Sequence, residues 1–536
     1  MSKLTRRAVL ATSAAALPNF AIAQADSRPV LTIAVQKISN SNTLETPREQ
    51  SNVGYRLSPL FAETLIDFNW TGDLSRVPGL ATAWRRIDDR TIEFDLRQNV
   101  RLHNGDTLTA EDVAFSLGPD RLFGAEPAKA GTSGLLAGSA SKEPPREVVA
   151  TGRRTFPGFE KIEIVRPGVV RFVNRVPDVT LEGRIAQNIG VILSHRGFAE
   201  AESWLAWARR PIGTGPYRIA EYRPDVSLTF ESHDDYWGGR PPARAVKIIE
   251  VPEVASRING LFSGEYDFIC DMPPDQIATI ERNARFEVLG SPINNIRLIT
   301  FDASHPVLRD PSIRRALSLA IDRKTIVDTL WSGRTQVPRG LQMEFYDDMY
   351  LADRAPPAFD PVEAKRLVTA SGYKGEPIVY RLLNNYYTNQ TANAQVLVEM
   401  WRAVGLNVRI EMKENWQQIN DPATQRGIRD WSNTSLFGDP VAGLVRGMGP
   451  HGELQLQREW TNESFNRLVR ELETSTDRAQ RRQTFARMLD IIEREDPGYL
   501  VLHQAATFTA KRKDIAWRAS KAWALDLRAA NLRFGA

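Results

Sequence analysis

Cysteine is almost absent from this chain, since Cys270 is the only one among 536 residues. A single thiol excludes a disulfide within the chain, a zinc site built from several cysteines and an iron–sulfur cluster held by several thiolates. Cys270 follows Tyr266-Asp267-Phe268-Ile269 in an apolar, strand-like context. That context favours a buried small side chain over a nucleophile.

Motifs for catalysis and for metal binding are also missing. The six histidines are scattered, and no two have the spacing that places a metal-binding pair on one face of a helix or strand, so we expect no metal and no cofactor. There is no G-x-S-x-G or Walker motif, and Gly213-Thr214-Gly215 continues into Pro216, which breaks the phosphate-binding glycine pattern. Acidic pairs such as Asp234-Asp235 leave a hydrolytic dyad open, but solvated carboxylates are the more common case. We therefore expect no catalytic residues and no enzyme.

The chain has no excess of one charge sign. Its 69 basic and 65 acidic side chains leave a net charge of +4. Spread over this length, that charge is too dilute for a nucleic-acid surface without a local patch, and the few short basic runs are typical of solvated faces. At about 100 to 200 residues per domain, the length indicates roughly two to four structural units with ample core.

The first residues predict an export signal. Thr5-Arg6-Arg7 precedes an Ala-rich, mildly apolar stretch and then Ala21-Ile22-Ala23, an A-x-A cleavage pattern, so we expect a cleaved signal peptide over residues 1–23. The paired arginines resemble the twin-arginine type, and the general secretory route stays open. The apolar stretch is shorter than the roughly 20 residues that span a bilayer, and no cysteine follows it for a lipid anchor. These features predict a free periplasmic protein.

Strand and helix patterns alternate through the remaining chain. We expect strands at 30–35, a hairpin at 84–96, and a helix that begins after the N-cap Thr109. Residues 120–157, rich in Gly, Ala, Pro and Ser, predict a long surface loop. Further on, residues 377–412 predict a strand, helix and strand unit, and 465–496 one or two surface helices. This mixture indicates an α/β architecture with at least two lobes.

Several blocks of residues carry a family resemblance. Val77 to Trp84, His103-Asn104-Gly105-Asp106 and Leu108 to Val113 resemble the signature of bacterial extracellular solute-binding proteins of family 5, the oligopeptide and dipeptide class of receptors for ATP-driven (ABC) importers. Further blocks follow in the family's order, namely Pro211 to Tyr217, Tyr236 to Gly239, Leu261 to Asp267, Ile313 to Ala316, Ala320 to Arg323, Phe359 to Pro361 and Ser371 to Tyr373.

The resemblance implies the periplasmic-binding-protein fold: α/β and bilobed, with discontinuous lobes and an extra inserted lobe, three lobes in all. It implies that lobe I comprises 27–70, 205–295 and 500–536, lobe II 71–204 and lobe III 296–499. The solute would be enclosed between lobes by hinge closure. The implied partners are a small-molecule solute and the permease in the inner membrane, with no nucleic acid, and we expect a monomer.

The ligand-binding residues follow partly from the resemblance. Peptide-binding members carry a tryptophan and, three residues later, an aspartate that pairs with the ligand's amino terminus; the matching residues here are Trp431 and Thr434. A hydroxyl does not neutralise a buried ammonium, and an unpaired buried charge costs several kcal/mol, roughly. Asp439 is a candidate for the missing charge or a turn residue before Pro440, and Asn433 and Thr434 are candidates for hydrogen bonds to hydroxyl or carboxylate groups.

A second group of candidates follows a predicted strand. Tyr386 and Tyr387 are candidates for stacking on the solute, Arg381 for holding a carboxylate, and Asn385 for hydrogen bonding. The alternative is that one tyrosine is core and Arg381 lies exposed along its strand. By the same reasoning, Trp517 and Trp523 are expected to be packing residues.

The sequence thus predicts a periplasmic substrate-binding receptor of an ABC importer that captures a peptide or an amino-acid-derived polar solute. Three alternatives stay open. The same fold binds a non-peptide solute such as an opine-like compound or a sugar conjugate, it presents a ligand to a chemoreceptor as a sensor, or, least favoured, the protein is an exported hydrolase.

Overall fold

A computed structural model describes residues 26–124 and 142–535 of the chain. The predicted signal peptide, residues 1–23, lies outside the described residues. Within the described ranges, no helix has the combination of length and apolar character that crossing a membrane needs.

One ten-stranded sheet runs through the molecule, in the order β10-β11-β12-β1-β13-β18-β14-β17-β15-β16. Its strands are β1 (Val30–Val35), β10 (Tyr217–Arg223), β11 (Ser227–Ser232), β12 (Ala245–Glu250), β13 (Phe268–Ile269), β14 (Phe286–Phe301), β15 (Ile378–Leu383), β16 (Val408–Lys413), β17 (Ile428–Thr434) and β18 (Tyr499–Arg512). We call the part around β10, β11, β12, β1 and β13 lobe I and the part around β17, β15 and β16 lobe III.

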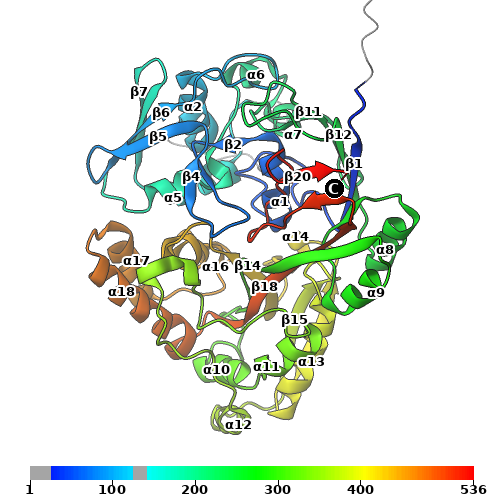
Figure 1. Ribbon diagram of the computed structural model, residues 1–536. Coiled ribbons are helices and arrows are strands. Elements are labelled where there is room, and N and C mark those ends of the chain that lie inside the picture. Colours follow the sequence, from blue (N-terminus) through cyan, green and yellow to red (C-terminus); the bar gives the residue numbers. More distant parts are fainter. Residues whose placement is uncertain (1–25, 125–141, 536) are drawn as a thin grey trace, which may run out of the picture.

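The two halves of this sheet are joined by its two longest strands. β14 and β18 pair antiparallel from Phe286 opposite Arg512 to Thr300 opposite Tyr499, and they cross the middle of the molecule in Figure 1. Their register shifts between Pro292 and Ile296, where the ladder changes from the lobe I half to the lobe III half, and again between Arg297 and Leu298. Proline has no N–H to donate to a ladder, so an irregularity at this point of a central strand is expected.

A separate sheet forms lobe II, at the upper left of Figure 1. Its order is β5-β6-β8-β7, from β5 (Ala81–Arg86), β6 (Thr91–Leu96), β7 (Phe159–Arg166) and β8 (Val169–Asn174). Three two-stranded sheets complete the strands: β2 (Glu63–Thr64) with β9 (Val191–Ile192), β3 (Ile66–Phe68) with β4 (Arg76–Pro78), and β19 (Ile515–Trp517) with β20 (Leu532–Phe534).

Helices cover these sheets. In lobe I and lobe II they are α1 (Asn52–Phe61), α2 (Ala110–Ser116), η1 (Pro119–Phe123), α4 (Arg146–Thr155), α5 (Leu181–Ile185), η2 (Asn188–Gly190), α6 (His195–Glu200), α7 (Trp204–Arg209), α8 (Val254–Ser263), η3 (Pro274–Gln276) and α9 (Ile277–Glu281). In lobe III they are α10 (Pro311–Leu319), α11 (Arg323–Leu330), η4 (Glu344–Met349), α12 (Pro361–Ala370), α13 (Gln390–Ala403), α14 (Trp416–Ile419), η5 (Val441–Val445), α15 (Arg446–Met448), α16 (Glu453–Leu456), α17 (Glu463–Thr474), α18 (Arg478–Asp490) and η6 (Ile491–Glu495).

The cores also connect the lobes. Buried Leu181 and Ile185 of lobe II belong to one apolar cluster with Phe437, Val441 and Phe485 of lobe III. Lobe II also contacts lobe III through the ion pair of Arg184 with Glu473, 3.0 Å. The described conformation is therefore one in which lobes II and III are in contact.

Many local predictions are confirmed. The strand at 30–35, the hairpin at 84–96, the strand, helix and strand unit β15-α13-β16 and the two helices after Phe465 are all present. Thr109 is the N-cap of α2, and the Asp112 carboxylate accepts from its backbone N–H at 2.9 Å, which closes a capping box. Cys270 is buried. The predicted lobe boundaries stay a prediction.

The loop predicted over residues 120–157 is wrong near both ends, and residues 125–141 lie outside the described residues. Pro119–Phe123 form η1, and residues 146–155 form α4, which buries Val148 and Val149. The composition of the stretch is typical of a loop, but Glu147 in the first turn and Arg153 and Arg154 in the last turn favour a helix through its dipole. In the sequence, the Gly and Pro content of the surrounding residues hides this helical signal.

Gly290 tests the importance of the crossing strands. A Cβ atom at this position would lie 2.0 Å from the backbone oxygen of Thr507 and 2.8 Å from the Cα of Phe508 on β18. We expect Gly290→Ala to lower the free energy of unfolding by about 2 kcal/mol or more, because one of the paired strands has to move. Ser291→Ala, one residue on, is the control and is expected to change stability by less than about 0.5 kcal/mol. Equal thermal midpoints for the two variants would contradict the prediction.

Candidate functional site

Three neighbouring cavities lie around Trp523, which lines all three. The first, which we call the large cavity, has a volume of about 70 Å³ and is lined by lobe I, lobe II and lobe III. Its walls include Tyr55, Glu63, Phe68, Trp70, Gln187, Asn188, Asn294, Thr434, Leu436 and Arg528. Its walls combine aromatic rings with amide, hydroxyl and charged groups, a mixed character that is typical of small-molecule sites.

The second, which we call the polar cavity, has a volume of about 30 Å³. Lobe I and lobe III both contribute to its walls, which include Gln36, Asn52, Arg56, Asp271, Asn295, Arg297, Trp331, Tyr386, Tyr387 and Thr388. A third cavity of about 30 Å³ is lined by lobe I alone and shares Arg56, Asp271 and Trp523 with the polar cavity. Residues distant in sequence therefore meet around these cavities.

Five residues of the polar cavity have a buried polar atom with no hydrogen-bond partner in the described part of the chain. These atoms are Arg56 Nη1, Asp271 Oδ2, Asn295 Oδ1, Trp331 Nε1 and Trp523 Nε1. A buried polar atom without a partner costs about 1–3 kcal/mol, so native proteins rarely gather several in one place without a use for them. The concentration of such atoms makes the polar cavity a candidate binding site.

Arg56 and Asp271 form an ion pair at the wall of this cavity, with Nη2 and Oδ1 2.5 Å apart. Arg56 is 5% exposed. Burial opposes the charge on Arg56, but the nearby Asp271 carboxylate outweighs burial and raises the pKa of the guanidinium. Asp271 adopts a left-handed backbone with φ of 58°, a conformation that non-glycine residues rarely hold outside special sites.

Arg297 provides a second buried cation. Its guanidinium carbon lies 3.3 Å from the centre of the Tyr387 ring, and Nη1 donates to the Trp431 carbonyl oxygen at 2.9 Å. Nη2 lies 3.4 Å from the Asp430 carboxylate, which also accepts from the Tyr380 hydroxyl at 2.8 Å. Arg297 is therefore held on both sides by the protein, and its contact fixes the ring of Tyr387 at the cavity wall.

The structure places the predicted tyrosines at the cavity. Tyr386 and Tyr387 both line it, and they pack with Trp416 in edge-to-face contacts. The Tyr386 hydroxyl accepts from Asn40 Nδ2 at 2.9 Å, a contact between lobe III and lobe I. The predicted Asn385, with φ of 50°, is a turn residue whose side chain accepts from the Thr391 backbone N–H at 3.2 Å.

The predicted residues of β17 are divided. Thr434 lines the large cavity and accepts from Asn295 Nδ2 at 2.7 Å. Asn433 is fully buried and donates to the Gly443 carbonyl oxygen at 3.1 Å. Trp431 is half-buried, with the Arg429 guanidinium carbon 5.6 Å from the centre of its ring. Neither Asn433 nor Trp431 lines any of the three cavities.

The two predicted charged candidates lie elsewhere. Asp439 is paired with Arg481 at 2.7 Å and also accepts from the Val441 backbone N–H at 3.0 Å. Arg381 is 3% exposed and donates to the Thr424 hydroxyl at 2.6 Å and the Gln425 carbonyl oxygen at 3.0 Å. Both therefore have partners within the protein and line none of the three cavities.

Sequence reasoning missed Arg56, Asp271 and Trp523. Arg56 lies within α1 and Asp271 directly after β13, and their pairing comes only from the fold. Trp523 was expected to pack, and the structure instead places it at the wall shared by all three cavities. Trp517, by contrast, is 7% exposed and donates to the Asp526 carbonyl oxygen at 2.9 Å, as expected of a packing residue.

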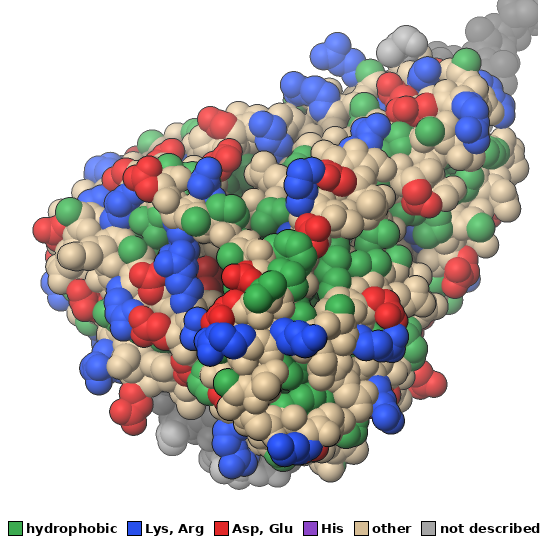
Figure 2. All heavy atoms as spheres, turned by 90° about the horizontal axis from the view of Figure 1, so that it is seen from below, with side chains coloured by type: hydrophobic (Ala, Val, Ile, Leu, Met, Phe, Trp, Pro, Cys, Tyr) green, Lys and Arg blue, Asp and Glu red, His purple; other side chains and the backbone are tan. Residues whose placement is uncertain are grey.

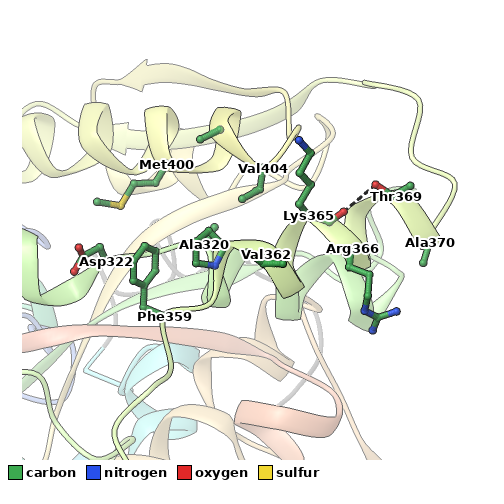
Figure 3. A pocket seen from close by; sticks show the side chains of 12 residues that line it. Ala320, Asp322, Phe359, Val362, Lys365, Arg366, Thr369, Ala370, Met400 and Val404 are labelled. Atoms are coloured by element: carbon green, nitrogen blue, oxygen red, sulfur yellow. Dashed lines mark hydrogen bonds between the residues drawn. The ribbon is translucent and has the colours of Figure 1, made fainter.

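A separate groove of about 810 Å³ lies on the outer surface of lobe III between α12, α13 and the end of α10. Figure 3 shows Phe359, Val362, Val404 and Met400 along it, with Lys365 and Arg366 beside it. Figure 2, which views the molecule from below, shows hydrophobic side chains near the middle of this face with charged residues around them. The groove is built by one lobe alone, so movement of the lobes relative to each other does not enclose it.

The described residues contain no group of three or more His, Cys, Asp or Glu side chains arranged to hold a metal ion. The fold and the cavities together define a receptor that encloses a small solute between lobes. Residues 75–444, more than half of the chain, match the family of bacterial extracellular solute-binding proteins, family 5 Middle. The chain therefore belongs to the family 5 extracellular solute-binding proteins, as the sequence resemblance predicted.

Relatives agree with this family and with the fold. The chain is 23% identical to heme-binding protein A of Haemophilus influenzae over 472 residues, covering 82% of this chain and 81% of that protein. It is 22% identical to the dipeptide-binding protein of Escherichia coli over 484 residues, covering 85% and 86%. The structure of a dipeptide-binding protein from Pseudoalteromonas sp. SM9913 in complex with Met-Leu superposes with a TM-score of 0.79 at 20% identity, covering 94% of this chain and 100% of that one. The predicted fold class is confirmed.

Glu63, at the wall of the large cavity, has a carboxyl group with a raised pKa. Burial raises the pKa of its carboxyl to about 7, although the side chains of Tyr236, Trp237 and Thr214 donate to it at 2.7, 2.9 and 2.8 Å. Because the folded-state pKa lies above the unfolded value of 4.5, the folded protein binds more protons between these two pH values. The contribution of Glu63 to stability therefore decreases as the pH rises from about 4.5 to 7, by about 3 kcal/mol.

Glu63→Gln removes this titration and keeps the shape of the side chain. We expect the thermal midpoint of the variant to rise relative to that of the wild type as the pH increases from 5 to 8. Scanning calorimetry of both proteins at several pH values measures the difference, and the buried His103 and His233 are present in both, so their contributions cancel. Parallel profiles of the two proteins would contradict the assignment.

Proposed function

We propose that this protein is the periplasmic receptor of an ABC importer and that it binds a peptide or an amino-acid-derived polar solute in the polar and large cavities. The concentration of five unpartnered buried polar atoms around the polar cavity is the observation that carries this proposal. The solute passes from the closed receptor to a permease in the inner membrane. No catalytic role is part of the proposal.

The site supports a solute with several hydrogen-bonding groups. Tyr387, Trp331 and Trp523 offer aromatic surface, while Arg56 and Asp271 offer opposite charges next to each other. A relative named for dipeptide binding and one named for heme binding both match most of the chain, so the family permits different solutes and the cavity residues decide among them. Asn433, Asp439 and Arg381 are not included in the proposed site, since their partners lie within the protein.

The predicted export signal and the family description support a periplasmic location. The family is extracellular by description, and the predicted signal peptide over residues 1–23 directs the chain across the inner membrane. We propose that the mature protein is free in the periplasm, without a lipid anchor, and monomeric.

Hinge closure supports the mechanism of capture. β14 and β18 connect lobe I to lobe III without a break in the chain, and their register shift at Pro292 to Ile296 is the natural place to bend. The irregularity also brings Asn294 to the large cavity and Asn295 to the polar cavity. A solute that bridges the lobes adds contacts in the closed state alone, and these contacts shift the population toward closure.

Native mass spectrometry of protein purified from its own periplasm tests the proposal directly. We expect one or a few small molecules to be released on denaturation, or, for empty protein, an increase of the thermal midpoint with at least one peptide or amino-acid derivative. Binding of an oligosaccharide would change the proposed class of solute and would still support the receptor function. Absence of any stabilising solute across peptides, amino acids, opines and oligosaccharides would contradict the receptor function.

The ion pair of Arg184 with Glu473 tests the role of closure. It joins lobe II to lobe III at 3.0 Å, so Glu473→Gln weakens a contact made in the closed state. We expect the solute identified above to bind about two- to fivefold more weakly by calorimetric titration. Glu471→Gln is the control, because Glu471 contacts Gln480 and Thr484 within lobe III. An unchanged affinity in Glu473→Gln would contradict a role of this pair in closure.

A further inference from the structure

The Arg56–Asp271 pair uses only half of its hydrogen-bonding capacity. Arg56 Nη2 bonds to Asp271 Oδ1, while Arg56 Nη1 and Asp271 Oδ2 have no hydrogen-bond partner in the described ranges. Both residues line the polar cavity and the third cavity. One N–H donor on the positively charged Arg56 and one acceptor oxygen on the negatively charged Asp271 therefore remain without partners at this wall.

The other unpartnered atoms extend this pattern. Trp331 Nε1 and Trp523 Nε1 add two donors, and Asn295 Oδ1 adds one acceptor. Trp331 is 2% exposed and Asn295 is fully buried, so water competes little for either. A carboxylate accepts from several donors, and an ammonium donates to several acceptors. Three donors and two acceptors around one cavity match a ligand that carries both groups.

Buried charges lie around this cavity. Arg56 is paired with Asp271, and Arg297 with Asp430. Buried Arg257, whose Nη2 donates to the Asp271 carbonyl oxygen at 3.3 Å, adds one further positive charge beside the first pair. A ligand carboxylate compensates this excess of positive charge, which a ligand that carries an ammonium alone would increase.

We propose that the polar cavity binds an α-amino-acid head group, with the carboxylate at Arg56 and the indole N–H groups and the ammonium at Asp271 and Asn295. This inference rests on the proposed receptor function and names the substrate class. Arg56 and Asp271 contact each other, so the ligand groups that bind to them have to be close together. A carboxylate and an ammonium on one α-carbon meet this condition, whereas the two ends of a peptide do not. The acid that the sequence lacks at Thr434 is replaced by Asp271, from a different element.

The substituent of the head group has a place in the structure. Trp523 is a wall of both the polar cavity and the large cavity. The large cavity has a volume of about 70 Å³, with Phe68, Trp70 and Leu436 on its walls. A partly apolar substituent on the head group would therefore lie next to aromatic and aliphatic side chains.

Calorimetric titration of wild-type protein with a matched ligand series tests the proposal. The series contains the twenty L-amino acids and γ-glutamyl conjugates, which keep both charges on one carbon, together with α-dipeptides, which separate them. For each binder, the N-acetyl and the carboxamide derivatives are measured. We expect binding of at least one ligand with both charges on one carbon, and a loss of at least tenfold when either charge is blocked.

Other outcomes overturn the inference in distinguishable ways. Blocked derivatives that bind within about threefold of the free ligand, or binding of α-dipeptides alone, would overturn the head-group assignment and leave the receptor function standing. The same conclusion holds if only uncharged solutes such as oligosaccharides bind. If no solute of any class binds, the receptor function fails with it.

Variants locate the head group. Asp271→Asn keeps the shape of the side chain and removes its charge, and we expect at least tenfold weaker binding of the zwitterion. Trp523→Phe removes one donor and keeps a ring, with an expected loss of about threefold. Glu231→Gln, in an exposed pair with Arg218 on lobe I, is the matched control and should bind as the wild type. Equal affinity of Asp271→Asn and Glu231→Gln would overturn the assignment, and the ligand series decides the question if Asp271→Asn fails to fold.

Discussion

The antiparallel pairing of β14 with β18 is the constraint on which the rest of this structure depends. Two strands of 16 and 14 residues carry one sheet from lobe I into lobe III, so both lobes share a backbone ladder and not only a linker. A ladder resists separation but bends where its register is interrupted. The interruption at Pro292 to Ile296 is therefore both the joint between lobes and the position from which Asn294 and Asn295 reach the cavities.

Electrostatics at this joint follow from burial. Charged side chains removed from water need partners, and Arg56, Arg297, Asp271 and Asp430 satisfy that need in two neighbouring pairs. The pairs still leave individual polar atoms without hydrogen-bond partners in the described part of the chain. A site of this kind is well suited to a polar ligand that carries both donors and acceptors, because such a ligand completes those hydrogen bonds.

The structure places the candidate residues from sequence in different surroundings. Tyr386 and Tyr387 lie three and four residues after the end of β15 at Leu383, and both line the polar cavity. Asp439 and Arg381 carried the right chemistry, but each found a partner within lobe III, Arg481 for the first and the Thr424 hydroxyl for the second. Charge alone does not distinguish a ligand contact from a buried structural pair.

The sequence by itself determined the family, the α/β class and most elements, because ordered motifs, capping residues and periodicity act over a few residues. It also determined that Thr434 lacks the charge of an aspartate. Only the tertiary structure decided that Arg56 of α1 meets Asp271 after β13, and that Trp523 stands between cavities. The physical reason is that the Arg56–Asp271 contact joins residues more than 200 positions apart, and its energy exists only after the fold has brought the two segments together.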